Sequence, residues 1–142
     1  MLNHELTGTQ TLTINAPVAK VWDGLTNPAI IKQYLFGTET KTTWEPGSDI
    51  TFSGEWNGQA YEDKGKVIRF DPEKCLEYTY WSAFAKLPDE PENYSHLKFE
   101  LEEKNGITEL KVTQTGFANE EGKKHSVDNW GSTLGKMKEL VE

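Results

Sequence analysis

Two Asn-Gly pairs, at positions 57–58 and 105–106, constrain the fold of this chain more than any other feature of its sequence. Asn-Gly supplies the positive φ angles that a two-residue type I′ turn requires, and this turn suits the twist of a β-hairpin. Leu97, Phe99 and Leu101 alternate with charged residues just before the second pair. The sequence therefore predicts two tight antiparallel hairpins.

The same period-two alternation, interrupted by turn residues, predicts further strands. The expected strands are Thr7–Ile14, Thr38–Trp44, Asp49–Trp56, Gln59–Phe70, Cys75–Ala83, Tyr94–Glu103 and Ile107–Gly116. Consecutive strands joined by short turns are typical of an antiparallel meander. Polar residues alternate with apolar ones, which indicates a sheet that is solvated on one face.

Three helices complete the predicted order. Pro17 and Pro28 each suit the first turn of a short helix. A long helix is expected over roughly Glu120–Glu142, where one apolar stripe recurs at spacings of three and four. The stripe consists of Val127, Trp130, Leu134, Met137 and Val141. An α+β fold follows, in which a curved antiparallel sheet of about seven strands wraps around the last helix, in the order β, two helices, six strands, helix.

Composition excludes several classes of partner. With 15 Lys+Arg against 23 Asp+Glu, the net charge of -8 argues against nucleic acid and against an anionic membrane surface. Cys75 is the only cysteine, which excludes an internal disulfide and a cysteine-based zinc site. The 142 residues suit one domain, 1–142. Without a basic or apolar leader at Met1–Leu6 or a long apolar run, a cytoplasmic protein is expected.

Ordered sequence blocks resemble a known superfamily. They are Thr13–Pro28, Trp44–Gly47, Gly54–Gly58, Gly65–Val67, Asp71-Pro72, Leu76–Trp81, Thr115–Phe117, and Asn129-Trp130 with Leu134. This set, over about residues 7–141, resembles the START-like or SRPBCC superfamily, and within it the group named after the activator of the heat shock protein 90 ATPase. The resemblance implies a helix-grip fold with an internal cavity for a lipid-like or other apolar ligand. Some members of the superfamily are cyclases, dehydratases or hydrolases. The eukaryotic activators carry a separate N-terminal domain, for which this chain is expected to have no room.

The aromatic residues are the main candidates for a ligand site. The sequence holds 5 Trp, 5 Tyr and 6 Phe, many of them in strands, and rings beside a few polar groups are typical of small-molecule pockets. Gln114 shares the phase of Leu110 and Val112, so its amide needs partners on an apolar face. The expected ligand-binding residues are Phe52, Trp56, Tyr78, Tyr80, Phe99, Gln114, Trp130 and Leu134. The alternative is that these rings only fill the core.

Other polar residues favour simpler interpretations. Glu55, Glu62 and Asp63 flank a turn, which predicts solvated carboxylates. His96 and His125 have no metal-ligand spacing and are expected at the surface. Cys75 lies beside Lys74, which could lower the pKa of its thiol, but a structural thiol is the preferred interpretation. We therefore predict no catalytic residue, no metal and no cofactor.

Three functions remain open from the sequence. The first is binding of a small apolar or lipid-like ligand between the sheet and the last helix. The second is interaction with a chaperone partner, as an activator of the heat shock protein 90 ATPase would have. The third is a cyclase or hydrolase, which would require an inward carboxylate, histidine or tyrosine pair with a perturbed pKa in the cavity.

Overall fold

The computed structural model describes residues 2–35, 37–56, 58–82 and 87–142, although the side chain of Trp56 lies outside the described part. The helices are α1 (Val18–Thr26), α2 (Pro28–Tyr34), the short 3-10 helix η2 (Pro91–Asn93) and α3 (Glu120–Val141). The strands are β1 (Asn3–Ile14), β2 (Glu39–Lys41), β3 (Asp49–Trp56), β4 (Gln59–Asp71), β5 (Cys75–Tyr80), β6 (Ser95–Lys104) and β7 (Ile107–Phe117).

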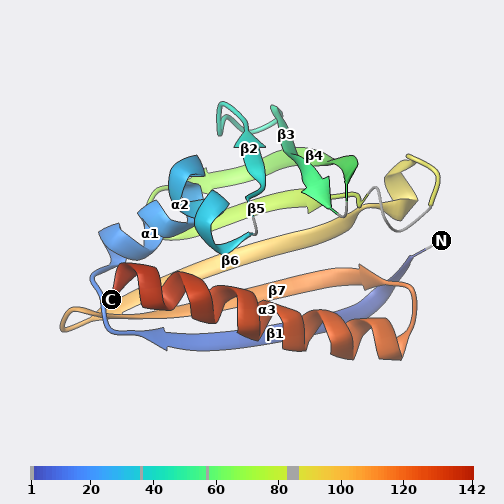
Figure 1. Ribbon diagram of the computed structural model, residues 1–142. Helices are drawn as coiled ribbons and strands as arrows, with labels where there is room; N and C mark the ends of the chain where they lie inside the picture. Colours follow the sequence, from blue (N-terminus) through green and yellow to red (C-terminus); the bar gives the residue numbers. More distant parts are fainter. Residues whose placement is uncertain (1, 36, 57, 83–86) are drawn as a thin grey trace.

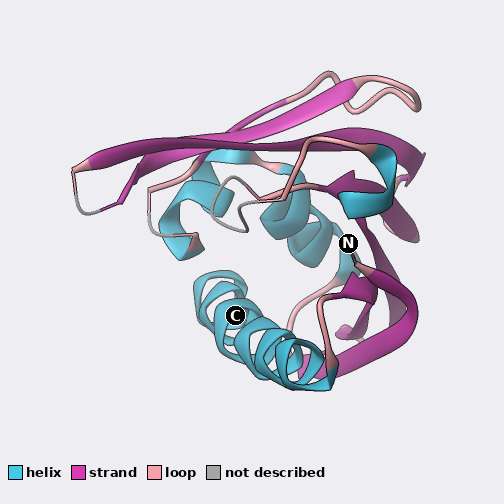
Figure 2. Cartoon of the chain, turned by 90° about the vertical axis from the view of Figure 1, so that its right-hand side faces the viewer, coloured by secondary structure: helices cyan, strands magenta, loops and turns pink. Residues whose placement is uncertain are grey.

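All strands of the described chain form one seven-stranded antiparallel sheet, in the order β1-β7-β6-β5-β4-β3-β2. The meander from β2 to β7 runs across the sheet, and β1 pairs with β7 at its far edge (Figure 1). The sheet curls around α3, as the view along that helix shows (Figure 2). This arrangement confirms the predicted α+β helix-grip fold.

The hairpin at 105–106 forms as predicted. Asn105 and Gly106 have φ angles of 53° and 79°, and the flanking Lys104 and Ile107 pair directly. Both central residues of a type I′ turn need such positive φ angles, which Asn and Gly tolerate best. At the other pair, Asn57 lies outside the described residues, while Gly58 has a φ angle of 77°.

Local capping explains where the helices begin. The Asn27 side chain accepts a hydrogen bond from the Ala29 backbone N–H at 3.0 Å, at the start of α2. At the start of α3, the Asn119 side chain accepts one from the Gly122 N–H at 2.8 Å. Each side chain satisfies a backbone donor that the first turn of a helix leaves without a partner. None of the helices in the described ranges is long and apolar enough to cross a membrane.

Three segments differ from the sequence prediction. The first strand begins at Asn3 rather than Thr7, and His4 Nε2 lies 2.8 Å from the Glu92 carbonyl oxygen, within hydrogen-bond distance. The expected strand Thr38–Trp44 shortens to Glu39–Lys41, and Trp44 has a φ angle of 64°, which is incompatible with an extended strand. The strand that starts at Cys75 ends at Tyr80 and not at Ala83, which lies outside the described residues.

The C-terminal helix packs unevenly on the sheet. Leu134, Met137 and Val141 are buried, and α3 contacts mainly β1, with further contacts to β7, α1 and α2. The helix therefore lies over one side of the curved sheet. Between α3 and the strands β3 to β5 lie aromatic side chains and the hollow described next.

Candidate functional site

A cavity of about 440 Å³ lies between the strands β3 to β7 and helix α3. Its volume is in the range of roughly 300–1,000 Å³ that is typical of small-molecule sites. The lining residues are Leu35, Thr38, Phe52, Glu55, Tyr61, Asp63, Tyr78, Tyr80, Leu97, Gln114, Ser126, Asn129, Trp130 and Thr133. Glu55 and Asn129 are exposed to solvent, which places the mouth of the cavity between the β3–β4 hairpin and α3.

The structure brings most of the predicted ligand-binding residues to this region. Five of them, Phe52, Tyr78, Tyr80, Gln114 and Trp130, line the cavity. The other two described ones, Phe99 and Leu134, line a void of about 30 Å³ that shares Leu35, Phe52, Tyr78 and Trp130 with the cavity. The backbone of Trp56 is the last residue of β3, but its side chain lies outside the described part.

The shared aromatic rings form the wall between the cavity and the small void. Ring centroids are 5.8 Å apart for Phe52 and Tyr78, 5.7 Å for Tyr78 and Phe99, and 5.6 Å for Phe99 and Trp130. These separations are typical of favourable aromatic pairs. The rings therefore pack against one another on one side and leave space on the other.

A buried carboxylate gives the cavity a polar wall. Asp63 is only 6% exposed and pairs with Phe52 across β3 and β4, which places both side chains on the inner face. The Tyr80 hydroxyl donates a hydrogen bond to Asp63 Oδ2. Burial, with the charge of Asp63 and this hydrogen bond, raises the pKa of Tyr80 well above its usual value. Tyr80 therefore stays protonated and remains a donor.

Two further polar contacts hold the cavity lining in place. Gln114 Oε1 accepts a hydrogen bond from Trp130 Nε1 at 2.9 Å, so α3 and β7 are joined across the inner end of the cavity. This satisfies the carbonyl oxygen of the amide that the sequence places on an apolar face, and Gln114 Nε2 lies 3.4 Å from Ser95 Oγ. The hydroxyls of Thr38 and Tyr61 lie 2.6 Å apart, which joins the α2–β2 connection to β4.

The sequence prediction for Asp63 was wrong. Asp63 was expected to be solvated beside the turn, yet it is buried, while Glu55 and Glu62 are exposed as expected. The sequence of β4 itself indicates that Asp63 faces inward. Lys64 and Lys66 share one phase with Glu62, so the opposite phase of β4, which includes Asp63, must face inward. Tyr61 shares this phase with Asp63, whereas Thr38 carried no comparable signal.

The neighbouring apolar residues Val67 and Ile68 lie on opposite faces of the sheet. Val67 is 1% exposed and Ile68 is 46% exposed. Ordinary strand alternation places Ile68 on the outer face, and the pairing of β4 with β5 shifts register there, between Val67 and Arg69, which is the signature of a β-bulge.

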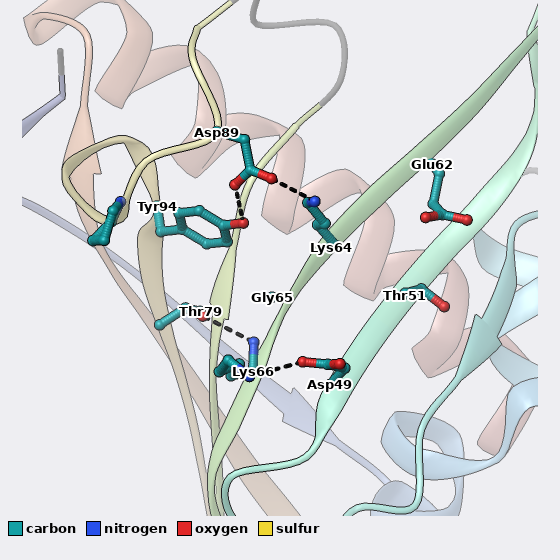
Figure 3. A pocket seen from close by; sticks show the side chains of 10 residues that line it. Asp49, Thr51, Glu62, Lys64, Gly65, Lys66, Thr79, Asp89 and Tyr94 are labelled. Carbon is teal, nitrogen blue, oxygen red and sulfur yellow. Dashed lines mark hydrogen bonds and ion pairs between the residues drawn. The ribbon is translucent and has the colours of Figure 1, made fainter.

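A larger hollow, of about 590 Å³, lies on the outer face of the sheet, opposite α3 (Figure 3). Both of its lysines are already paired: Lys66 Nζ lies 2.9 Å from Asp49, and Lys64 pairs with Asp89, which also accepts a hydrogen bond from Tyr94. These side chains are between 40% and 77% exposed for the two ion pairs. Water competes for every polar group there, so the inner cavity is the stronger candidate for a ligand site.

Other reactive groups do not form a site. The described residues hold no group of three or more histidine, cysteine or acidic side chains that could bind a metal ion. His125 is exposed, and the side chain of His96 is 40% exposed. Burial raises the pKa of the Cys75 thiol, contrary to any lowering by the adjacent Lys74. A structural role for this thiol agrees with that shift.

Comparison with known proteins agrees with the fold. The model of one family, described as activator of Hsp90 ATPase homolog 1-like proteins, matches residues 15–142. The chain belongs to this family. No curated protein matches the chain.

Similar solved structures extend this agreement. ChR145 from Cytophaga hutchinsonii is 40% identical, with a TM-score of 0.85 over 98% of this chain and 95% of that one. MLL2253 from Mesorhizobium loti is 24% identical, with a TM-score of 0.77 over 96% of both chains. Ara h 8.0201 is 15% identical, with a TM-score of 0.77 over 96% of this chain and 97% of that one. The last two likenesses concern the fold alone.

Proposed function

We propose that the protein binds a small, largely apolar molecule in the cavity between the curved sheet and α3. The observation that carries this proposal is a cavity of about 440 Å³ whose wall combines aromatic rings with the buried Asp63 and its hydrogen-bond donor Tyr80. Apolar surfaces gain roughly 25 cal/mol for each Å² removed from water, so rings supply affinity. The few convergent polar groups supply orientation.

Obstruction of the mouth tests this proposal. Asn129 lines the cavity and is exposed, so Asn129→Trp introduces a ring where a ligand would enter. Ser132 is exposed on the same helix but does not line the cavity, so Ser132→Trp is the matched control. The probe is N-phenyl-1-naphthylamine, a neutral molecule that fluoresces in apolar surroundings. We expect saturable binding to the wild type and to Ser132→Trp, and at least tenfold weaker binding to Asn129→Trp. Equal affinity for the two variants would contradict the proposal.

A second candidate function is acid–base catalysis on a molecule held in the cavity. This function would require an inward carboxylate, histidine or tyrosine pair with a perturbed pKa. Asp63 and Tyr80 form a hydrogen-bonded pair on the inner face, and the pKa of Tyr80 is raised. A carboxylate in a cavity can accept a proton while a neighbouring tyrosine donates one. The test is deuterium exchange at the α-carbon of α-tetralone in D₂O, followed by NMR. Catalysis predicts faster exchange with the wild type than with Asp63→Asn, and equal rates would exclude it for this substrate.

A further inference from the structure

Two buried hydroxyl groups on the cavity wall have no hydrogen-bond partner in the described part of the chain. Tyr78 on β5 and Thr133 on α3 both line the cavity, and they are 8% and 6% exposed. Neither hydroxyl forms a hydrogen bond with a residue that the structure describes. Both oxygens nevertheless border space that a water molecule can reach. They are therefore buried polar groups that a molecule in the cavity can contact.

Other polar side chains of the cavity wall do have partners within the protein. Tyr80 donates a hydrogen bond to Asp63, and Trp130 donates one to Gln114. A buried hydroxyl without a partner destabilises a folded protein, whereas phenylalanine or valine would fill nearly the same volume without that cost. The hydroxyls of Tyr78 and Thr133 therefore point to a partner that comes from outside the chain.

Both hydroxyls are positioned as donors. The Tyr78 ring centroid lies 5.8 Å from that of Phe52 and 5.7 Å from that of Phe99, so two neighbouring rings hold it in place. Burial raises the pKa of Tyr78 well above its usual value, so its hydroxyl keeps its proton. Thr133 lies one turn after Trp130 on the same face of α3, and both line the cavity. One donor thus comes from the sheet and the other from the helix.

These donors restrict the chemistry of a molecule that fills the cavity. A molecule without a polar atom would displace water from both hydroxyls and leave them unpaired, which weakens its binding. A carbonyl oxygen carries two lone pairs and no proton, so it can accept hydrogen bonds from hydroxyl donors. Sites built to form a hydrogen bond with a ligand group reject analogues that lack this group. The two hydroxyls therefore favour a ligand with an oxygen acceptor over a hydrocarbon of the same shape.

On the basis of the proposed binding function, we infer that the ligand is an apolar molecule with a carbonyl-type oxygen, and that Tyr78 and Thr133 are the donors that recognise this oxygen. The aromatic rings supply affinity for the apolar body. The two hydroxyls act as specificity-determining groups, which select ketones, esters or amides over hydrocarbons.

Two probes of nearly the same shape test this inference. They are 2-acetylnaphthalene and 2-isopropenylnaphthalene, in which a terminal CH₂ group replaces the carbonyl oxygen. Each is titrated at pH 7 against bound N-phenyl-1-naphthylamine, and the ratio of their dissociation constants measures the preference for the ketone. We expect Tyr78→Phe and Thr133→Val each to reduce this preference about threefold to tenfold, because each removes one hydrogen bond to the oxygen.

The possible results separate this inference from the binding function. An unchanged ratio in one variant would remove that residue from the recognition of the oxygen. An unchanged ratio in both variants would overturn the inference while the proposed binding function stands. Failure of all three probes to bind the wild type would overturn the binding function, and the inference with it.

Tyr34→Phe is the matched control. Tyr34 is 5% exposed, but its hydroxyl donates a hydrogen bond to the Gly24 carbonyl oxygen at 2.8 Å, and it does not line the cavity. We expect this variant to lower Tm and to leave the ketone preference unchanged. Tyr78→Phe should instead keep or raise the Tm of the ligand-free protein, because it removes an unpaired buried hydroxyl. Equal losses of Tm in the two variants would show that the Tyr78 hydroxyl has a partner within the protein, and would overturn its role in recognition.

Discussion

The two hollows share strand β4 yet differ in what surrounds it. Residues Glu62, Lys64 and Lys66 line the outer hollow, whereas Asp63 lines the inner cavity. The outer hollow is larger, but its ion pairs are at least 40% exposed on either side, and the inner carboxylate is 6% exposed. Interactions between charges weaken in water and strengthen when water is excluded. Burial, more than volume, therefore distinguishes the proposed ligand site from the outer hollow.

Removal of an inner ring gives the largest expected difference between the two faces. Phe99 is 2% exposed and contacts the rings of Tyr78 and Trp130. We expect Phe99→Ala to lower the free energy of unfolding by about 3–5 kcal/mol, because it removes buried apolar surface and leaves a cavity. Ile68→Ala on the outer face removes a side chain that is 46% exposed and should cost less than about 1 kcal/mol. Urea denaturation of both variants measures the difference, and similar losses would mean that the ring wall is not part of the stable core.

Two tyrosine variants compare a tyrosine–aspartate hydrogen bond on the inner face of the sheet with one on the outer face. Tyr80 donates to the buried Asp63, and Tyr94 donates to the more exposed Asp89. We expect Tyr80→Phe to destabilise the protein by about 1–3 kcal/mol, because a buried carboxylate loses a hydrogen bond that water cannot fully replace. Tyr94→Phe should have a clearly smaller effect, since water reaches Asp89. Thermal and urea denaturation give both values, and a Tyr94→Phe variant that is the less stable of the two would reverse the comparison.

These contrasts show which parts of the molecule were predictable. The hairpin at Asn105-Gly106 and the long helix depend on local chemistry, namely positive φ angles and an apolar stripe, and the sequence contains both signals. The rings of Phe52 and Tyr78 followed from strand alternation. The position of Trp44 did not, because a residue with β propensity there takes a φ angle of 64° that only the tertiary structure imposes.

The polar part of the site was harder to predict for a physical reason. A carboxylate such as Asp63 is far more often solvated than buried, so a turn beside it favours the surface. Only the phase of the whole strand, with Glu62, Lys64 and Lys66 together on one face, indicates the inward direction. The bond between Gln114 and Trp130 joins residues on separate elements, and its partner could not be read from spacing. The volume of the cavity could not be predicted from the sequence either, because it depends on how far α3 lies from β3 to β5.

The smallest expected effects belong to the ion pairs of the outer hollow. The hydrogen bond and charge of Lys64, followed by the hydrogen bond from Tyr94, hold the pKa of Asp89 below its usual value. As the pH falls, the Asp89 carboxylate therefore becomes protonated in the unfolded chain before it does so in the folded protein. The Lys64–Asp89 pair stabilises the fold above about pH 4, and this contribution is lost at lower pH. We expect Asp89→Asn to lower Tm slightly at pH 7, and the difference from wild type to shrink in 0.5 M NaCl and at pH 3.

Asp49→Asn serves as the control for this last variant. The Lys66–Asp49 pair is 66% and 77% exposed, compared with 41% and 40% for Lys64–Asp89. If exposure governs the strength of these pairs, Asp49→Asn should change Tm even less than Asp89→Asn. Calorimetric melting curves of the two variants at both salt concentrations check this order. A larger, salt-resistant loss in either variant would show that water does not screen the charges of the outer hollow.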